Sequence, residues 1–320
     1  METNTLKRCG AKDIHFAQAQ QASLALGRVI SQSHGEYTLL TEDGEILLSV
    51  TGKFRHEAEN PACFPIAGDW VLLSPRGIER LLPRETFLAR MAAGPVPYVQ
   101  PIAANMDVCF VCMALDSGYN PAKLERFLSA AEKSGARVVT VLTKADLCAD
   151  LNGALGAARA LCPGADVIAC TCETKDGFDA ARAYMKEGVT AVLVGASGAG
   201  KSTLINALLG ADALETQAVR RDGKGRHTTT RRELILLPSG GLVIDTPGMR
   251  SLALEESDVG AVFPEMEELA SQCRFRDCTH THEPGCAVQG ALARGEIDAR
   301  RYKSYLKLME EQKRRARRRR

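Results

Sequence analysis

The glycine-rich segment 195–202, GASGAGKS, has the spacing of a phosphate-binding loop. It matches G-x-x-x-x-G-K-[ST] in full and lies between a strand-like run (AVLV) and a helix-like run (TLINALLG). Glycines let backbone N–H groups point at phosphate oxygens, Lys201 adds positive charge beside the β- and γ-phosphates, and the Ser202 hydroxyl binds Mg²⁺. A chance glycine-rich turn would lack this context, so the segment predicts a nucleoside triphosphate site. Its residues are Gly195, Ala196, Ser197, Gly198, Ala199, Gly200, Lys201, Ser202 and Thr203.

A second motif, DTPG, begins at Asp245 and completes the apolar run GLVID. A carboxylate at the end of a strand can hold Mg²⁺ through water, and the N–H of Gly248 can contact a γ-phosphate. DTPG is also an ordinary turn sequence. Its position at a strand end, about 50 residues after the phosphate loop, favours the nucleotide role.

A third motif, TKAD at 143–146, ends the apolar run RVVTVL. The carboxylate of Asp146 can accept hydrogen bonds from guanine N1–H and the exocyclic amine together, and adenine offers no such donor pair. The motif therefore predicts GTP rather than ATP, although Asp146 alone could equally cap a helix. Segment 171–173, TCE, is a weaker candidate for the loop that backs the base. The guanine-site candidates are Thr143, Lys144, Ala145 and Asp146.

The order of these motifs is reversed relative to an ordinary GTPase, because the guanine motif precedes the phosphate loop and DTPG comes last. Strand-like runs alternate with helical patterns, including a helix over Pro121–Ser134, which predicts a mainly parallel sheet covered by helices. Moving the second half of this region to the front would restore a GTPase sheet, so we predict a circular permutation. The expected strands are Val108–Leu115, Val138–Thr143, Val167–Cys170, Ala191–Val194, Glu233–Leu237 and Leu242–Asp245, the last two forming a hairpin.

Residues 273–286, CRFRDCTHTHEPGC, gather three cysteines and two histidines. Three thiolates and one imidazole suit a closed tetrahedral Zn²⁺ site, which has a structural rather than a catalytic role. The alternative is three buried free cysteines. The candidate ligands are Cys273, Cys278 and Cys286 with either His280 or His282. The other eight cysteines are scattered through apolar or helical stretches, and most are expected to be small buried hydrophobic residues.

The N-terminal third has a different pattern. Residues 1–22 are polar and predict a disordered tail, whereas short β-like runs from Leu26 to Leu82 predict a small barrel, either an OB-fold or an SH3-like barrel. Trp70, the only tryptophan, is expected in the barrel core. The proline-rich segment 92–101 predicts a linker.

Composition allows two or three domains in 320 residues and hides a charge asymmetry. The net charge is +2, but residues 313–320 hold seven basic residues, leaving 34 basic and 39 acidic residues and a charge of −5 elsewhere. The basic segment is either a solvated charge run or, as we favour, part of an RNA-binding surface. No apolar run is long enough to span a bilayer and no signal peptide is present, so a cytoplasmic protein without membrane contact is expected.

TKAD, GASGAGKS, GRHTTT (225–230) and DTPG, in this order, resemble the RsgA (YjeQ) family of circularly permuted GTPases over residues 24–315. The resemblance implies an OB-fold, a permuted GTPase domain and a mainly α-helical zinc-binding domain. It favours His280 as the fourth ligand of one structural Zn²⁺. The family commonly has Asn where this chain has Thr143. The expected divisions are a tail at 1–22, the barrel at 23–85, the GTPase domain at 86–252 and the zinc domain with its basic tail at 253–320.

The residue after DTPG is Met249, where many GTPases place a glutamine that orients water. A thioether cannot do this, so slow intrinsic hydrolysis is expected, with stimulation by the small ribosomal subunit as the resemblance implies. His227 is the candidate for positioning the water; its alternative roles are an RNA contact or a turn cap. One of Thr228–Thr230 is expected to bind Mg²⁺ or the γ-phosphate. The expected catalytic residues are Lys201, His227 and Thr229, and the expected Mg²⁺ ligands are Ser202, Thr229 and Asp245.

The function these features favour is a monomeric GTPase that binds GTP, GDP, the small ribosomal subunit and its rRNA, and couples hydrolysis to late subunit maturation and its own release. The alternative is a nucleotide-gated rRNA-binding switch with incidental turnover. A P-loop ATPase or kinase is disfavoured by TKAD.

Overall fold

Six strands form the central part of an eleven-stranded sheet in the computed structural model, which describes residues 5–92, 98–116, 119–171, 176–196, 198–210, 233–245, 263–275 and 278–318. The strand order is β10-β9-β8-β11-β13-β12, and only β12 is antiparallel to its neighbour. All six predicted strands are present. They are β8 (Val108–Ala114), β9 (Arg137–Thr143), β10 (Asp166–Ala169), β11 (Thr190–Gly195), β12 (Glu233–Leu236) and β13 (Leu242–Asp245).

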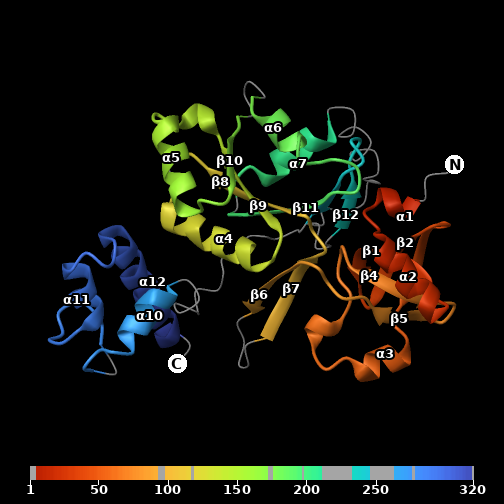
Figure 1. Cartoon of the computed structure of the whole chain (residues 1–320), viewed down its shortest axis with the longest axis horizontal. Coiled ribbons are helices and arrows are strands. Elements are labelled where there is room, and N and C mark those ends of the chain that lie inside the picture. The colour runs from red at the N-terminus through yellow and green to blue at the C-terminus, as the bar shows by residue number, and fades with distance from the viewer. Residues whose placement is uncertain are drawn as a thin grey trace. The chain divides into compact units, whose positions relative to one another are not determined.

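Alternation along β8 gives the sheet two apolar faces. Cys109 and Val111 belong to a core that includes side chains of helices α4 (Pro121–Lys133) and α5 (Leu151–Leu161). Phe110 and Cys112 belong to the core beneath helices α6 (Phe178–Arg182) and α7 (Lys201–Leu209). Figure 1 shows these helix pairs on opposite sides of the sheet. The predicted helix over 121–134 is confirmed, with Asn120 capping it and Pro121 in its first turn.

The N-terminal strands close as a five-stranded barrel. β1 pairs with β2 and β4, β2 pairs with β3, β4 pairs with β5, and a parallel bridge between Val50 and Ile78 joins the ends of β3 and β5. This order, with helix α3 (Gly52–Glu57) between β3 and β4, decides in favour of the OB-fold. The barrel elements are β1 (Ala25–Ser33), β2 (Glu36–Thr41), β3 (Gly44–Ser49), η1 (Pro61–Cys63), β4 (Trp70–Ser74) and β5 (Gly77–Leu81).

The prediction of a disordered tail over residues 1–22 is wrong for residues 5–22, which form helices α1 (Thr5–Arg8) and α2 (Asp13–Ala22). Their apolar side chains cover the outer face of β4, where Leu6 packs in one cluster with Trp70 and Leu72. Because alternate residues of β4 also fill the barrel, this strand is buried on both faces and needs such a cover. Trp70 is buried, with 2% of its surface exposed, but it belongs to this outer cluster and not to the barrel core in which it was expected.

The linker prediction over 92–101 is also wrong at both ends of the segment. β6 (Phe87–Ala92) and β7 (Tyr98–Ala104) form an antiparallel ribbon. Pro101 pairs with Ala89 beside a register shift, and both strands are edges of a two-stranded sheet, so the missing N–H of proline is tolerated.

Contacts divide the chain into two units, residues 1–252 and 253–320. In its described part, the second unit consists of helices α10 (Pro264–Ala270), α11 (Ala287–Ala293) and α12 (Ala299–Arg318) around Met266, Val288 and Tyr305. Helix α12 continues through the basic residues 313–318. No helix in the described part of the chain is long and apolar enough to cross a membrane.

Truncation of Leu6 tests the packing of the N-terminal helices. We expect Leu6→Ala, at a fully buried position, to lower the free energy of unfolding by about 3 kcal/mol. The control is Ile14→Ala, at a position that is 56% exposed, with an expected change below about 0.5 kcal/mol. Urea unfolding followed by the fluorescence of Trp70 measures both; equal effects would contradict packing of this segment on the barrel.

Candidate nucleotide and metal sites

The phosphate loop joins the carboxyl end of β11 to the start of α7. Gly195 has φ 146°, and a Cβ there would lie 2.2 Å from the carbonyl oxygen of Cys112, so only glycine fits this approach of two strands. The Lys201 ammonium donates to the carbonyl oxygens of Gly195 at 2.8 Å and Ala196 at 2.6 Å. The loop therefore curves around this ammonium group. Ser197 lies outside the described residues.

A cation and a carboxylate share the edge of the sheet at this loop. Asp245 ends β13, which pairs directly with β11. Burial lowers the pKa of Lys201, and burial raises the pKa of Asp245 while the charge on Lys201 opposes that rise. Both groups are thus partly removed from water and lie close enough to interact, which strengthens any interaction with a phosphate or a metal ion. Ser202 lies in the first turn of α7.

Other predicted residues of the phosphate site fall outside the described part of the chain. They are Gly248, Met249, His227 and Thr228–Thr230.

The guanine motif lies beside the phosphate loop. Thr143 ends β9, and its buried hydroxyl donates to the carbonyl oxygen of Ala199 at 3.0 Å. A Cβ on Gly200 would lie 3.0 Å from the same hydroxyl, so the two motifs are in direct contact. Thr143 therefore supplies a side-chain bond that joins the guanine motif to the phosphate loop.

The other residues of the motif contact two neighbouring segments. Lys144 has φ 55° and pairs with Asp116 at 2.6 Å, just after β8. Asp146, in the 3-10 turn η2 (Ala145–Leu147), is exposed and accepts a hydrogen bond from the hydroxyl of Thr171. The alternative of Asp146 as a helix cap does not hold, because α5 is capped by Asp150.

Sequence reasoning missed Asp116 and gave Thr171 only as part of a weaker candidate loop. The available signal was position, because both residues directly follow strands of the parallel sheet. Residues 172–175 lie outside the described part.

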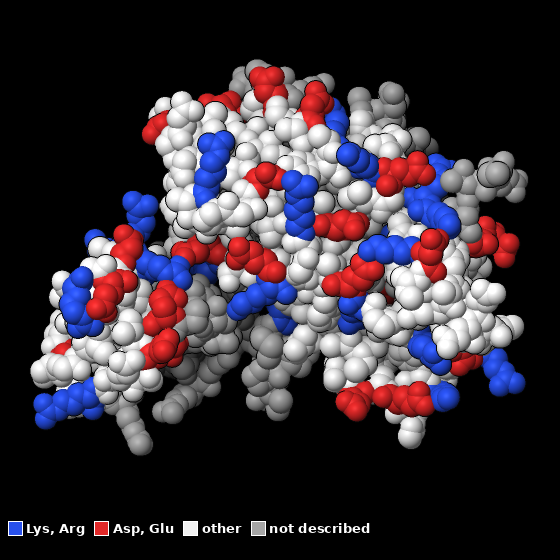
Figure 2. All heavy atoms as spheres, in the orientation of Figure 1, with Lys and Arg blue, Asp and Glu red and all other residues white. Residues whose placement is uncertain are grey.

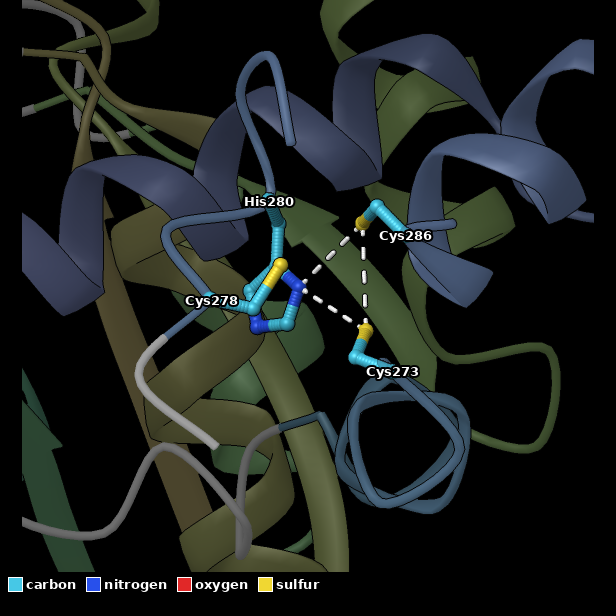
Figure 3. Close-up of side chains that lie close together, drawn as sticks. All are labelled: Cys273, Cys278, His280 and Cys286. Carbon is cyan, nitrogen blue, oxygen red and sulfur yellow. Dashed lines mark hydrogen bonds between the residues drawn. The ribbon is translucent and has the colours of Figure 1, made fainter. Parts of the chain in front are cut away.

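In the second unit, three sulfurs and one ring nitrogen converge (Figure 3). Cys273 follows α10, Cys278 and His280 lie in the next loop, and Cys286 caps α11. The four ligand atoms lie within 4.8 Å of one another. His282 is exposed and does not belong to this group, so the geometry selects His280.

The separations fit a tetrahedral Zn²⁺. Two sulfurs about 2.3 Å from one such ion lie about 3.8 Å apart, and a sulfur and an imidazole nitrogen about 3.5 Å apart. The Sγ atoms of Cys273 and Cys286 are 3.8 Å apart, and Nδ1 of His280 lies 3.5 Å and 3.4 Å from them. Metal bound here would join α10 to α11 through four ligands and would leave no open position for catalysis.

The surroundings of the cluster orient its ligands. The backbone N–H groups of Ala287 and Gln289, at the start of α11, donate to the sulfurs of Cys273 and Cys286, each at 3.4 Å. His280 has φ 60°, and its carbonyl oxygen accepts from Gln289 at 3.2 Å and from the hydroxyl of Tyr302. These bonds hold the strained histidine in place.

Comparison with known proteins decides the family. The model of the family described as RsgA GTPase matches residues 81–255. This chain belongs to the RsgA GTPase family. The RsgA family relatives include "Small ribosomal subunit biogenesis GTPase RsgA 2" of Lactiplantibacillus plantarum, 48% identical over 292 residues, covering 89% of this chain and 83% of the relative. The RsgA of Opitutus terrae is 42% identical over 309 residues, covering 91% and 84%.

Two solved structures share the RsgA fold. YjeQ from Thermotoga maritima has a TM-score of 0.60 and 28% identity, covering 90% of this chain and 98% of that chain. YloQ, described as a circularly permuted GTPase, has a TM-score of 0.55 and 26% identity, covering 91% and 96%. These matches confirm the predicted family, the permuted fold and the activity of a GTP hydrolase.

Metal analysis of the purified full-length protein tests the zinc site of this RsgA family member. We expect about one zinc per chain, and a loss of more than half of it in Cys278→Ala and His280→Ala, because each removes one of four ligands. His282→Ala is the matched control and keeps the metal. Less than about half an equivalent in the wild type, or equal losses in the two histidine variants, would contradict the assignment.

Proposed function

We propose that this GTPase acts in biogenesis of the small ribosomal subunit, where GTP hydrolysis is coupled to late maturation of the subunit and to release of the protein. The observation that carries the nucleotide part is the direct contact between the guanine motif and the phosphate loop through Thr143 and Ala199. The names of relatives up to 48% identical support the ribosomal part.

Each end of the nucleotide has its own residues in this proposal. Backbone N–H groups of residues 195–203 and the ammonium of Lys201 bind the phosphates, so that Lys201 exchanges its carbonyl partners for phosphate oxygens. Ser202 and Asp245 hold Mg²⁺, which neutralises charge on the β- and γ-phosphates. Asp146, oriented by Thr171, accepts from the guanine base.

Hydrolysis itself is proposed to depend on the segment 225–230. His227 positions the attacking water, and Thr229 binds Mg²⁺ or the γ-phosphate. Met249 follows DTPG and cannot orient water, so the intrinsic rate is slow and the subunit supplies the stimulation.

Contact with rRNA is proposed through the barrel and the second unit. The face in Figure 2 mixes Lys and Arg with Asp and Glu, without a large patch of one sign among the described residues. Positive charge is instead concentrated in residues 313–320, of which 313–318 continue helix α12. Such a basic helix end binds phosphate backbones without reading sequence. The zinc cluster serves as the structural core that holds the helices of this unit.

Selection of guanine through Asp146 gives the first test. Because two charge-assisted hydrogen bonds are lost, we expect Asp146→Asn to weaken GTP binding about 100-fold. The variant should gain affinity for xanthosine triphosphate, whose base carries a carbonyl where guanine has its amine. Asp150→Asn makes the same change at the cap of α5, where asparagine also caps well, and leaves both affinities unchanged. Competition against a fluorescent guanine nucleotide measures this, and unaltered GTP affinity in Asp146→Asn would contradict the role.

The ribosomal role is tested by GTP turnover with and without purified small subunits. We expect stimulation of about tenfold or more by small subunits and none by large subunits, together with co-sedimentation that is stronger with a non-hydrolysable GTP analogue than with GDP. Nucleotide-dependent binding with equal turnover rates would favour the second candidate, a nucleotide-gated rRNA-binding switch with incidental hydrolysis. Equal binding under both nucleotides would contradict both.

A further inference from the structure

Arg28 on β1 is a buried cation at the junction of the barrel and the central sheet, with 1% of its surface exposed. One terminal nitrogen donates to the carbonyl oxygen of Cys9. The other donates to the hydroxyl of Thr190 at 2.8 Å and the carbonyl oxygen of Asn105 at 3.3 Å. Its guanidinium group lies 4.8 Å from the ring of Trp70. A single side chain thus joins the N-terminal helical segment, the barrel, the β7–β8 turn and β11.

Burying the guanidinium group of Arg28 costs free energy that a residue serving only to fill space would not need to lose. Among the described residues no carboxylate forms an ion pair with Arg28, although the charges of Asp107 and Asp69 act on it, and its Nε has no hydrogen-bond partner. Desolvation of a guanidinium is costly, and an apolar side chain of similar volume would avoid that cost. The geometry therefore suggests a role for the bonds themselves.

The bond to Thr190 reaches the strand that carries the phosphate loop. Thr190 is the first residue of β11, and the strand runs from there to Gly195, where the loop begins. The backbone of Thr190 is fixed on its other side, because its N–H donates to the Asp107 carboxylate at 2.8 Å and its carbonyl accepts from the Asp107 N–H at 2.7 Å. The Arg28 bond is thus the contact by which the barrel acts on this strand.

The same strand of the barrel also touches the other side of the nucleotide site. Ser31 of β1 pairs with Glu233, the first residue of β12. β12 directly follows the segment that contains 225–230 and forms a hairpin with β13, which ends at Asp245. β1 therefore contacts two elements that lead into the proposed phosphate and Mg²⁺ residues.

We propose that β1 couples the barrel to GTP hydrolysis and that Arg28, acting through Thr190, is the positioning residue of this coupling. The inference rests on the proposed function, since the barrel ligand is taken to be the rRNA of the small subunit. Movement of β1 on binding RNA shifts the amino end of β11 and the register of β12. Beside this bond, a cavity of about 420 Å³ lined by Arg28, Asn105 and Thr190 gives the junction room to rearrange. The binding part of this coupling is reciprocal: if RNA at the barrel changes the relative affinity for GTP and GDP, the nucleotide changes the affinity for RNA by the same factor.

The test removes the bond with the smallest change of shape. Thr190→Val deletes the acceptor hydroxyl and Thr190→Ser restores it. Thr140→Val makes the same change on β9, where the buried hydroxyl has no hydrogen-bond partner among the residues that the structure describes. For Thr190→Val we expect GTP affinity and subunit-free turnover within about twofold of wild type. Subunit-stimulated turnover should fall about fivefold, and the ratio of subunit affinities with a GTP analogue and GDP should fall by about fivefold or more. Thr190→Ser and Thr140→Val should match the wild type.

Two measurements separate the outcomes. If Thr190→Val keeps the wild-type stimulation and the wild-type ratio of subunit affinities, the bond has no coupling role and the inference is overturned. If its subunit-free turnover falls as much as its subunit-stimulated turnover, the bond has only a local role, which also overturns the inference. If Thr190→Val does not fold, Arg28→Lys, which keeps the charge but shortens the reach, replaces it with the same expected losses. Wild-type protein that shows neither stimulation nor nucleotide-dependent subunit binding would instead contradict the proposed function, before any variant is compared.

Discussion

The parallel pairing of β11 between β8 and β13 is the constraint on which the rest of this protein depends. β8 precedes β11 by about 80 residues, and β13 follows it by about 50, yet the three strands are hydrogen-bonded side by side. Because parallel strands end at the same edge of a sheet, Asp116, Gly195 and Asp245 emerge together. The guanine motif follows β9, the next strand along. Fixing this sheet thus assembles the nucleotide site from four distant segments.

The permutation leaves this assembly unchanged and alters what is attached to it. The phosphate loop still follows the central strand, and Thr143 still reaches it through a side-chain bond to Ala199. The chain now enters the sheet from the barrel through β6 and β7, and β13 is the last strand that the structure describes before the second unit. The barrel contributes β1 beside β12, so the sheet and the barrel share hydrogen bonds as well as a chain connection.

The sequence predicted correctly those elements that depend only on residues close together in the chain. The phosphate loop, the three cysteines of the Cys/His cluster and the six strands each depend on short spacings or apolar runs, and sequence was sufficient to predict them. The choice between His280 and His282 needed the geometry of the cluster. The N-terminal helices were mispredicted because the polar composition of residues 1–22 says nothing about the partner they cover. A signal lay in the run WVLL at Trp70–Leu73, which is apolar on both faces and therefore needs a layer outside the barrel. The choice between an OB-fold and an SH3-like barrel could be made only from the bridge between Val50 and Ile78, because this long-range contact has no pattern in the sequence.

Two cations at opposite ends of β11, the half-buried Lys201 and the buried Arg28, show the same limit of prediction from sequence. Lys201, beyond the carboxyl end, was predictable because a motif surrounds it. Arg28, at the amino end, lies alone in a strand pattern and is defined only by tertiary contacts. Burial lowers the pKa of both, to about 10 for Arg28, so Arg28 remains charged at neutral pH. Lys201 and Arg28 both donate hydrogen bonds largely to backbone carbonyl oxygens. The carbonyl oxygens that Lys201 contacts belong to the glycine-rich loop, which is the proposed phosphate site. The partners of Arg28 belong to four packed segments, so its charge serves to hold the barrel and the phosphate-loop strand in one register.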